Sequence, residues 1–128
     1  MISLPYSVRV FLHAPPTDLR KGFDSLCGLV TTAFGQDPTS GHLFLFVNRR
    51  RDRMKILYWD RDGLAIWYKR LEIGSFQTPA TATKAASIEM TPTQLALILS
   101  GIDLKSARQR KRYQRPMPAA EKSISTPL

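Results

Sequence analysis

Basic side chains gather in two short segments of this 128-residue chain, and phosphate binding is the chemistry that they suit best. The first segment holds Arg49, Arg50, Arg51, Arg53 and Lys55 around one acidic residue, Asp52. Guanidinium groups bind phosphate oxygens through paired hydrogen bonds, and a loop between two strands would carry them outward. We therefore predict that this segment contacts phosphates. The alternative interpretation is a basic loop that is merely solvated.

The second basic segment is the C-terminal tail, in which residues 104–128 carry seven basic residues against one acidic residue, Glu121. The formal charge of the whole chain is +9, so these two segments hold all of the excess. Concentrated positive charge favours a polyanion, because Lys and Arg release counterions from phosphates. We place nucleic acid first and an acidic protein surface second. The expected DNA contacts of the tail are Arg108, Arg110, Lys111, Arg112 and Arg115.

Patterns for catalysis or metal binding are weak. The chain has two histidines, His13 and His42, and one cysteine, Cys27, which is too few for a zinc site or a disulfide framework. Asp60 and Asp62 form the closest carboxylate pair, and a hairpin turn already explains both. We expect no catalytic residue, no metal and no cofactor.

Alternating apolar residues predict strands at residues 8–12, 54–59 and 64–71, and a continuous aromatic and β-branched run predicts a buried strand at 42–48. A short fifth strand is the expectation for residues 87–90. A long helix is expected from Leu19 to Phe34, capped by Thr17 or Asp18 and ended by Gly35. A shorter helix should follow a capping box at residues 91–94 and end at Gly101. The predicted fold class is α+β, with a mostly antiparallel sheet of four to five strands.

A turn closed by a left-handed Gly63 should join the third and fourth of these strands. A helix on one face of the sheet then buries every second side chain, for which we expect Ile56, Tyr58, Ile66 and Tyr68. The opposite face would expose Trp59, Trp67 and Lys69 as a partner surface. The alternative is a platform on which bases stack, formed by the aromatic residues Tyr58, Trp59, Trp67 and Tyr68, with Arg53, Lys55 and Lys69 along the phosphates.

The length of the chain suits one domain, which we place at residues 1–104. Residues 105–128 are rich in charge and proline, and we expect them to form a disordered basic tail. No apolar run approaches the roughly 18 residues of a membrane span. We expect a soluble, cytoplasmic protein.

Several motifs occur in an order that resembles a known family. They are Thr17-Asp18-Leu19-Arg20-Lys21-Gly22-Phe23-Asp24-Ser25-Leu26, Asp37-Pro38 with Ser40-Gly41-His42-Leu43-Phe44, Asn48-Arg49-Arg50-Arg51-Asp52-Arg53, Trp67-Tyr68-Lys69-Arg70-Leu71-Glu72, and the closing segment from Leu99 to Asp103. Together they resemble the TnpB accessory protein of the insertion sequence 66 family, over about residues 6 to 104.

The resemblance implies a small protein that is encoded beside a DDE-type transposase and assists transposition without catalysing strand transfer. No catalytic residue is carried over from that family. Our hypothesis is a non-catalytic accessory protein that binds DNA through the basic loop and tail. The alternative is an adaptor that contacts the transposase or a sister accessory subunit through the exposed sheet face.

Overall fold

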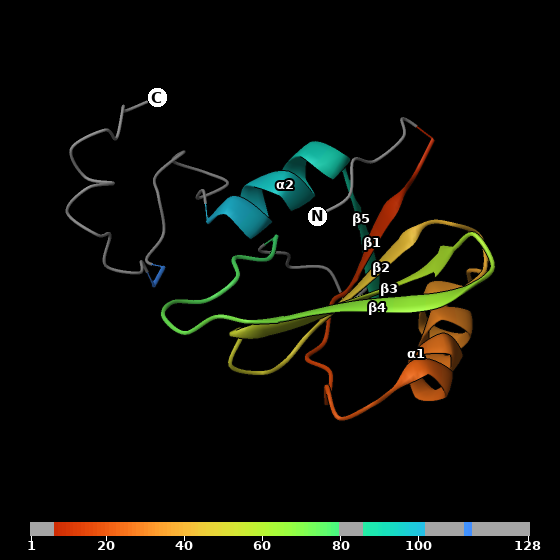
Figure 1. The fold of residues 1–128 in the computed structure, drawn as a ribbon, viewed down its shortest axis with the longest axis horizontal. Coiled ribbons are helices and arrows are strands. Elements are labelled where there is room, and N and C mark those ends of the chain that lie inside the picture. The colour runs from red at the N-terminus through yellow and green to blue at the C-terminus, as the bar shows by residue number, and fades with distance from the viewer. Residues whose placement is uncertain (1–6, 80–85, 102–111, 114–128) are drawn as a thin grey trace.

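Three consecutive strands in the middle of the chain pair antiparallel, as the alternating sequence predicts. They are β2 (Leu43–Val47), β3 (Arg53–Asp60) and β4 (Gly63–Arg70). β1 (Val10–His13) pairs parallel with β2, and β5 (Ser87–Met90) pairs antiparallel with β1. The result is a five-stranded mixed sheet in the order β4-β3-β2-β1-β5 (Figure 1). The one parallel pair arises because the connection from β1 to β2 crosses over and carries a helix.

The computed structural model describes residues 7–79, 86–101 and 112–113. Of the predicted tail contacts only Arg112 falls within these ranges, whereas Arg108, Arg110, Lys111 and Arg115 lie outside them. The expected disorder of residues 105–128 likewise concerns residues outside the described part, apart from Arg112 and Tyr113.

The first helix begins later than the sequence indicates. α1 (Phe23–Leu29) continues into a π-helical turn, η1 (Val30–Phe34), and ends as expected at the left-handed Gly35. The predicted start near Thr17 and Asp18 is wrong, because the Thr17 N–H donates to the Val47 carbonyl at 2.8 Å. The carboxylate of Asp18 instead accepts the N–H of Arg20 at 3.0 Å and closes a turn. The helix after β1 is therefore short.

Both predicted caps of the second helix, α2 (Pro92–Ser100), are confirmed. Thr91 accepts the N–H of Gln94 at 3.1 Å, and the Gln94 side chain accepts the N–H of Thr91 at 2.9 Å. Gly101 ends the helix with φ 79°. Among the described residues, neither helix is long and apolar enough to cross a membrane.

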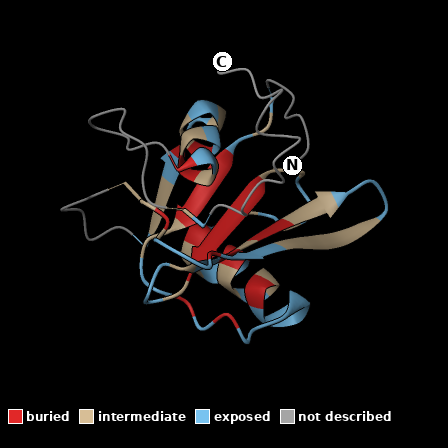
Figure 2. Cartoon of the chain, turned by 60° about the vertical axis from the view of Figure 1, so that its left-hand side comes forward, coloured by how far each residue is buried: buried red, intermediate tan, exposed pale blue. Residues whose placement is uncertain are grey.

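Apolar side chains fill both faces of the sheet, so the fold has three layers (Figure 2). Leu95 and Ile98 of α2 cover one face, and Leu26 and Val30 cover the other. β2 is buried along its whole length, because its side chains alternate between the two cores. The expectation of a second, exposed sheet face therefore fails for the central strands.

The register between β3 and β4 also differs from the expected one. Asp60 pairs with Gly63, so only Arg61 and Asp62 form the turn, and Arg61 rather than Gly63 adopts positive φ, at 59°. Ile56 consequently lies opposite Trp67, and Lys55 lies opposite Tyr68. A shift of one residue exchanges the faces of a strand, so Trp67 points toward the α2 side and Tyr68 toward the α1 side.

Candidate nucleic-acid interface

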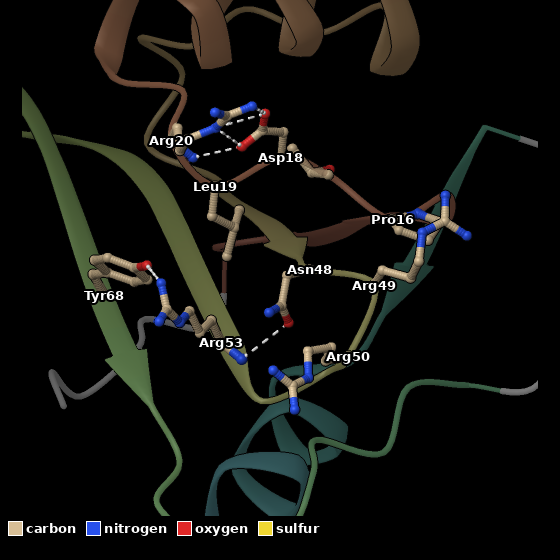
Figure 3. Close-up of a pocket in the computed structure, with 10 residues that line it drawn as sticks. Pro16, Asp18, Leu19, Arg20, Asn48, Arg49, Arg50, Arg53 and Tyr68 are labelled. Carbon is tan, nitrogen blue, oxygen red and sulfur yellow. Dashed lines mark hydrogen bonds and ion pairs between the residues drawn. The ribbon is translucent and has the colours of Figure 1, made fainter.

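A cleft of about 590 Å³ lies between the segment that precedes α1, the β2–β3 loop and Tyr68 of β4 (Figure 3). Its lining is rich in arginine and comprises Pro16, Thr17, Asp18, Leu19, Arg20, Asn48, Arg49, Arg50, Arg53 and Tyr68. The structure thus brings Arg49, Arg50 and Arg53 of the predicted set together. It adds Arg20, which the charge pattern does not indicate, and Tyr68, which belongs to the alternative stacking platform and is otherwise expected in the core.

The β2–β3 loop is held in one shape by its own polar residues. The Asn48 amide nitrogen donates to the Asp52 carboxylate at 2.7 Å, and the amide oxygen accepts the N–H of Arg53 at 3.1 Å. The bond from Asn48 lowers the pKa of Asp52, with a further contribution from the nearby charge of Arg50. Arg51 takes positive φ, at 61°, and donates its N–H to the Asn48 carbonyl at 3.0 Å. These bonds fix the backbone from which the arginines project.

Two backbone hydrogen bonds join the segment after β4 to the same loop. The N–H of Leu71 donates to the Asp52 carbonyl at 2.7 Å, and the N–H of Phe76 donates to the Arg51 carbonyl at 2.7 Å. Arg51 lines a different, small pocket together with Thr78. The predicted arginine triplet is therefore divided, because its third member does not line the cleft.

The opposite wall of the cleft carries an ion pair. The Arg20 guanidinium donates two hydrogen bonds to the Asp18 carboxylate, from Nε to Oδ1 at 3.0 Å and from Nη2 to Oδ2 at 2.7 Å. These side-chain hydrogen bonds lower the pKa of Asp18 to about 2 and raise the pKa of Arg20. Asp18 therefore stays ionised at neutral pH, and the pair adds no net charge to this wall.

Tyr68 stands where the cleft meets β4, and 47% of the residue is exposed. Its hydroxyl oxygen lies 3.5 Å from Nη1 of Arg53. The ammonium of Lys55 lies 4.8 Å from the ring centroid and donates to the Lys21 carbonyl at 2.8 Å. Lys55 thus supports Tyr68 and does not itself line the cleft.

Arg49 and Arg50 supply the available positive charge. Within the described part of the chain, neither guanidinium makes a hydrogen bond or an ion pair, and both line the cleft. An arginine with no partner in its own fold keeps all of its N–H donors for a ligand. A bound anion would therefore meet two uncommitted guanidinium groups beside Arg53.

Arg112 occupies a different part of the molecule. Its Nη1 donates to the Ser75 carbonyl at 3.1 Å, and its guanidinium carbon lies 5.6 Å from the centroid of the Phe76 ring. The half-buried side chain thus packs on the folded domain.

The residues of the predicted partner surface do not share one face. Trp67 packs against the α2-side core, and Lys69 is on the same face two residues along the strand. Trp59 points to the α1 side, where its indole N–H donates to the Arg61 carbonyl at 3.1 Å. The adaptor hypothesis therefore loses the single continuous surface on which it relied.

The two histidines make hydrogen bonds within the fold, and the cysteine is not activated. Nδ1 of His13 lies 3.1 Å from both the Pro15 carbonyl and the Thr17 hydroxyl, and burial lowers the pKa of His13. Nδ1 of His42 accepts the N–H of Arg9 at 3.0 Å. Burial raises the pKa of the Cys27 thiol, which leaves it unactivated. Among the described residues no group of three or more His, Cys, Asp or Glu could hold a metal ion.

Comparison with known proteins identifies the family of the chain. Residues 8–109 match the family described as IS66 Orf2 like protein. The uncharacterized protein y4jC of Sinorhizobium fredii (strain NBRC 101917 / NGR234) is 33% identical over 120 residues, which cover 94% of this chain and 100% of that relative. The uncharacterized protein y4hO of the same strain is 33% identical over 109 residues, or 85% of this chain and 93% of the relative. No solved structure matches. Both relatives align over nearly their whole length and the family match covers most of the fold, so the chain belongs to the IS66 Orf2-like family.

Proposed function

We propose that this protein is a non-catalytic accessory protein of insertion-sequence transposition that binds DNA through the arginine cleft. Its family is associated with transposition, which makes DNA a natural partner. The observation that carries the proposal is that Arg49, Arg50 and Arg53 all line one cleft of about 590 Å³. Two of these side chains have no hydrogen bond or ion pair within the described part of the chain.

The rigidity of the loop supports this function. Binding through a flexible loop loses part of its free energy to ordering, and a loop that is already fixed avoids that loss. Asn48 and Asp52 hold the loop from within, and Phe76 holds it from outside. Contacts from such a loop to phosphates would position the protein on DNA without reading its sequence. The basic tail is proposed to add further phosphate contacts of the same kind.

The proposal is tested by fluorescence anisotropy with the full chain and DNA from the ends of the element. Arg50→Ala removes one uncommitted guanidinium, and we expect affinity to fall about 10-fold, the size of one charge-assisted hydrogen bond. Arg61→Asn is the control, because Arg61 is an arginine of the other hairpin loop and lies outside the cleft, and asparagine suits its positive φ of 59°. Equal losses in the two variants would remove the cleft from the proposal.

A DNA of equal length and scrambled sequence distinguishes binding through phosphates alone from binding that also reads bases. Phosphate contacts alone predict similar affinity for both DNAs, whereas base contacts predict a preference for the element end. If the full chain binds neither DNA at low salt, the proposed function is wrong.

A further inference from the structure

We infer that the arginine cleft takes a single unpaired DNA strand, with one base stacked on Tyr68. This inference rests on the proposed function and names the form of DNA that the site accepts. The cleft is open to solvent, and its volume of about 590 Å³ falls in the range of small-molecule sites. A duplex keeps its bases stacked inside, so it would have to flip a nucleotide out to fill such a space. An unpaired strand presents its bases without that cost.

The arrangement of Tyr68 beside the arginines is the second observation. Proteins that bind single strands combine a cationic groove for the phosphates with an aromatic ring for the bases. Tyr68 lines the cleft with nearly half of its surface exposed, and Arg53 lies within 3.5 Å of its hydroxyl oxygen. A phosphate on Arg53 and a base on the ring would therefore belong to the same or adjacent nucleotides.

Lys55 fixes the ring for this role. Its ammonium lies 4.8 Å from the ring centroid, and it is itself held by the Lys21 carbonyl at 2.8 Å. A single ammonium group covers only one face of a ring, and 47% of Tyr68 remains exposed. A supported ring loses little conformational entropy when a base stacks on it.

The distribution of charge fits one phosphate backbone. Arg49, Arg50 and Arg53 all come from the loop side of the cleft (Figure 3). On the other wall Arg20 is neutralised by Asp18, whose pKa of about 2 keeps it ionised. A strand would run its phosphates along the loop side and turn its bases toward Tyr68.

The test compares an unpaired oligothymidine with a mixed-sequence duplex of the same length, both fluorescently labelled and bound to the full chain. We expect the single strand to bind more tightly. Tyr68→Leu should weaken single-strand binding about 10-fold and change duplex binding by less than about 2-fold, because only an unpaired base can stack on the ring. Tyr68→Phe keeps the ring and should retain binding, which would show that the ring and not the hydroxyl is required; the nearly unchanged duplex binding of Tyr68→Leu is the check that this variant folds.

Tyr113→Leu is the matched control, since Tyr113 is also an exposed tyrosine, at 53%, and lines a separate pocket with Lys69 and Leu99. We expect it to leave single-strand binding unchanged. Thymidine monophosphate as a competitor distinguishes a strand from a free nucleotide, and it should not displace the oligonucleotide at equal nucleotide concentration.

Three outcomes would overturn the inference. They are a duplex bound more tightly than the single strand, equal effects of Tyr68→Leu and Tyr113→Leu, and full displacement by the mononucleotide. In the first two cases duplex binding that depends on Arg50 would leave the proposed function standing. Failure of the chain to bind either DNA would remove both.

Discussion

Two regions of the molecule use arginine in opposite ways. In the cleft, the guanidinium groups of Arg49 and Arg50 make no hydrogen bond or ion pair with any described residue. Arg112 instead donates to the Ser75 carbonyl at 3.1 Å and lies over the ring of Phe76. All three residues stand in strongly basic stretches of sequence. The difference shows that the charge of a stretch does not separate arginines that hold the fold from those that are free to bind a ligand.

The two regions meet at Phe76, which is fully buried. Its backbone N–H donates to the Arg51 carbonyl at 2.7 Å, and the Arg112 guanidinium lies over its ring. One segment therefore supports both the arginine loop and the contact of Arg112. Variants in either region need a measurement of stability beside the measurement of binding.

The largest expected effect comes from removing both uncommitted arginines. Arg49→Ala combined with Arg50→Ala should weaken DNA binding about 100-fold, because each charge-assisted hydrogen bond contributes about 1.5 kcal/mol. The midpoint of thermal unfolding should stay within about 2 °C, since neither side chain bonds to the described fold. Anisotropy and a thermal melt on the same preparation check both parts. A lower melting temperature with unchanged affinity would reverse the assignment of the two regions.

Arg112→Ala should show the opposite pattern. Loss of the bond to Ser75 and of the contact with Phe76 should lower the free energy of unfolding by about 1.5 kcal/mol. DNA affinity should change by less than about 3-fold. Urea denaturation measures the first quantity, and Arg112→Lys, which keeps the charge but not the planar group, should be destabilised as well. If Arg112→Ala weakens DNA binding as strongly as the cleft variant, its contact with the domain is not its main role.

A smaller effect is expected at the neutralised wall of the cleft. Asp18→Asn removes the negative charge beside Arg20 while an amide oxygen can still accept the N–H of that residue. The freed guanidinium should strengthen DNA binding about 3-fold, as expected for an exposed ion pair. Asp37→Asn is the matched control, because Asp37 also closes a turn, accepting the N–H of Thr39 at 2.8 Å, and does not line the cleft. An equal gain in both variants would show an effect of net charge alone.

Binding should not depend on the ionisation of Asp18 between pH 5 and pH 8. The folded-state pKa of Asp18 is lowered from 3.8 to about 2, so the ion pair contributes to stability above pH 3.8 and is lost as the pH falls through about 2. A rise in DNA affinity from pH 8 to pH 5 in wild type that is absent in Asp18→Asn would contradict this assignment, because it would show that protonation of Asp18 frees Arg20 in this range.

The smallest effect concerns His13, which does not itself line the cleft. Burial lowers its pKa in the folded protein below the ordinary 6.5, so the unfolded chain binds the proton more readily. The stability that His13 contributes is therefore complete above pH 6.5 and declines as the pH falls through 6.5 toward the folded-state pKa. Urea denaturation at pH 8 and pH 5.5 should show the decline in wild type and a smaller one in His13→Gln. Equal declines would assign the pH dependence to other groups.

Most of the strands could be predicted because their signals are local. Alternation predicts β3 and β4, and the capping box at Thr91 predicts the start of α2. The start of α1 could not be predicted in this way, because Asp18 suits a helix cap and a turn equally well. A tertiary contact, the hydrogen bond from the Thr17 N–H to the Val47 carbonyl, favours the turn over the helix cap.

The cleft was predicted in part for a related reason. The charge of the β2–β3 loop was sufficient to select Arg49, Arg50 and Arg53. A turn closed by Gly63 would place Tyr68 in the core beside Ile56, because it adds one residue to the β3–β4 loop and so reverses the face of every residue in β4. The charge pattern does not indicate Arg20, because a helix that begins at Leu19 would place this residue in its first turn, although its spacing from Asp18 suits an ion pair.

The most direct test of DNA binding by the cleft is the salt dependence of binding. Affinity for element-end duplex would be measured across salt concentrations for the full chain and for the variant with Arg49→Ala and Arg50→Ala. If about five phosphates are neutralised, the slope of log affinity against log salt should be about −4 to −5 for wild type. It should be shallower by about two in the variant. Parallel slopes would contradict our account, because the two arginines would then not contact phosphates.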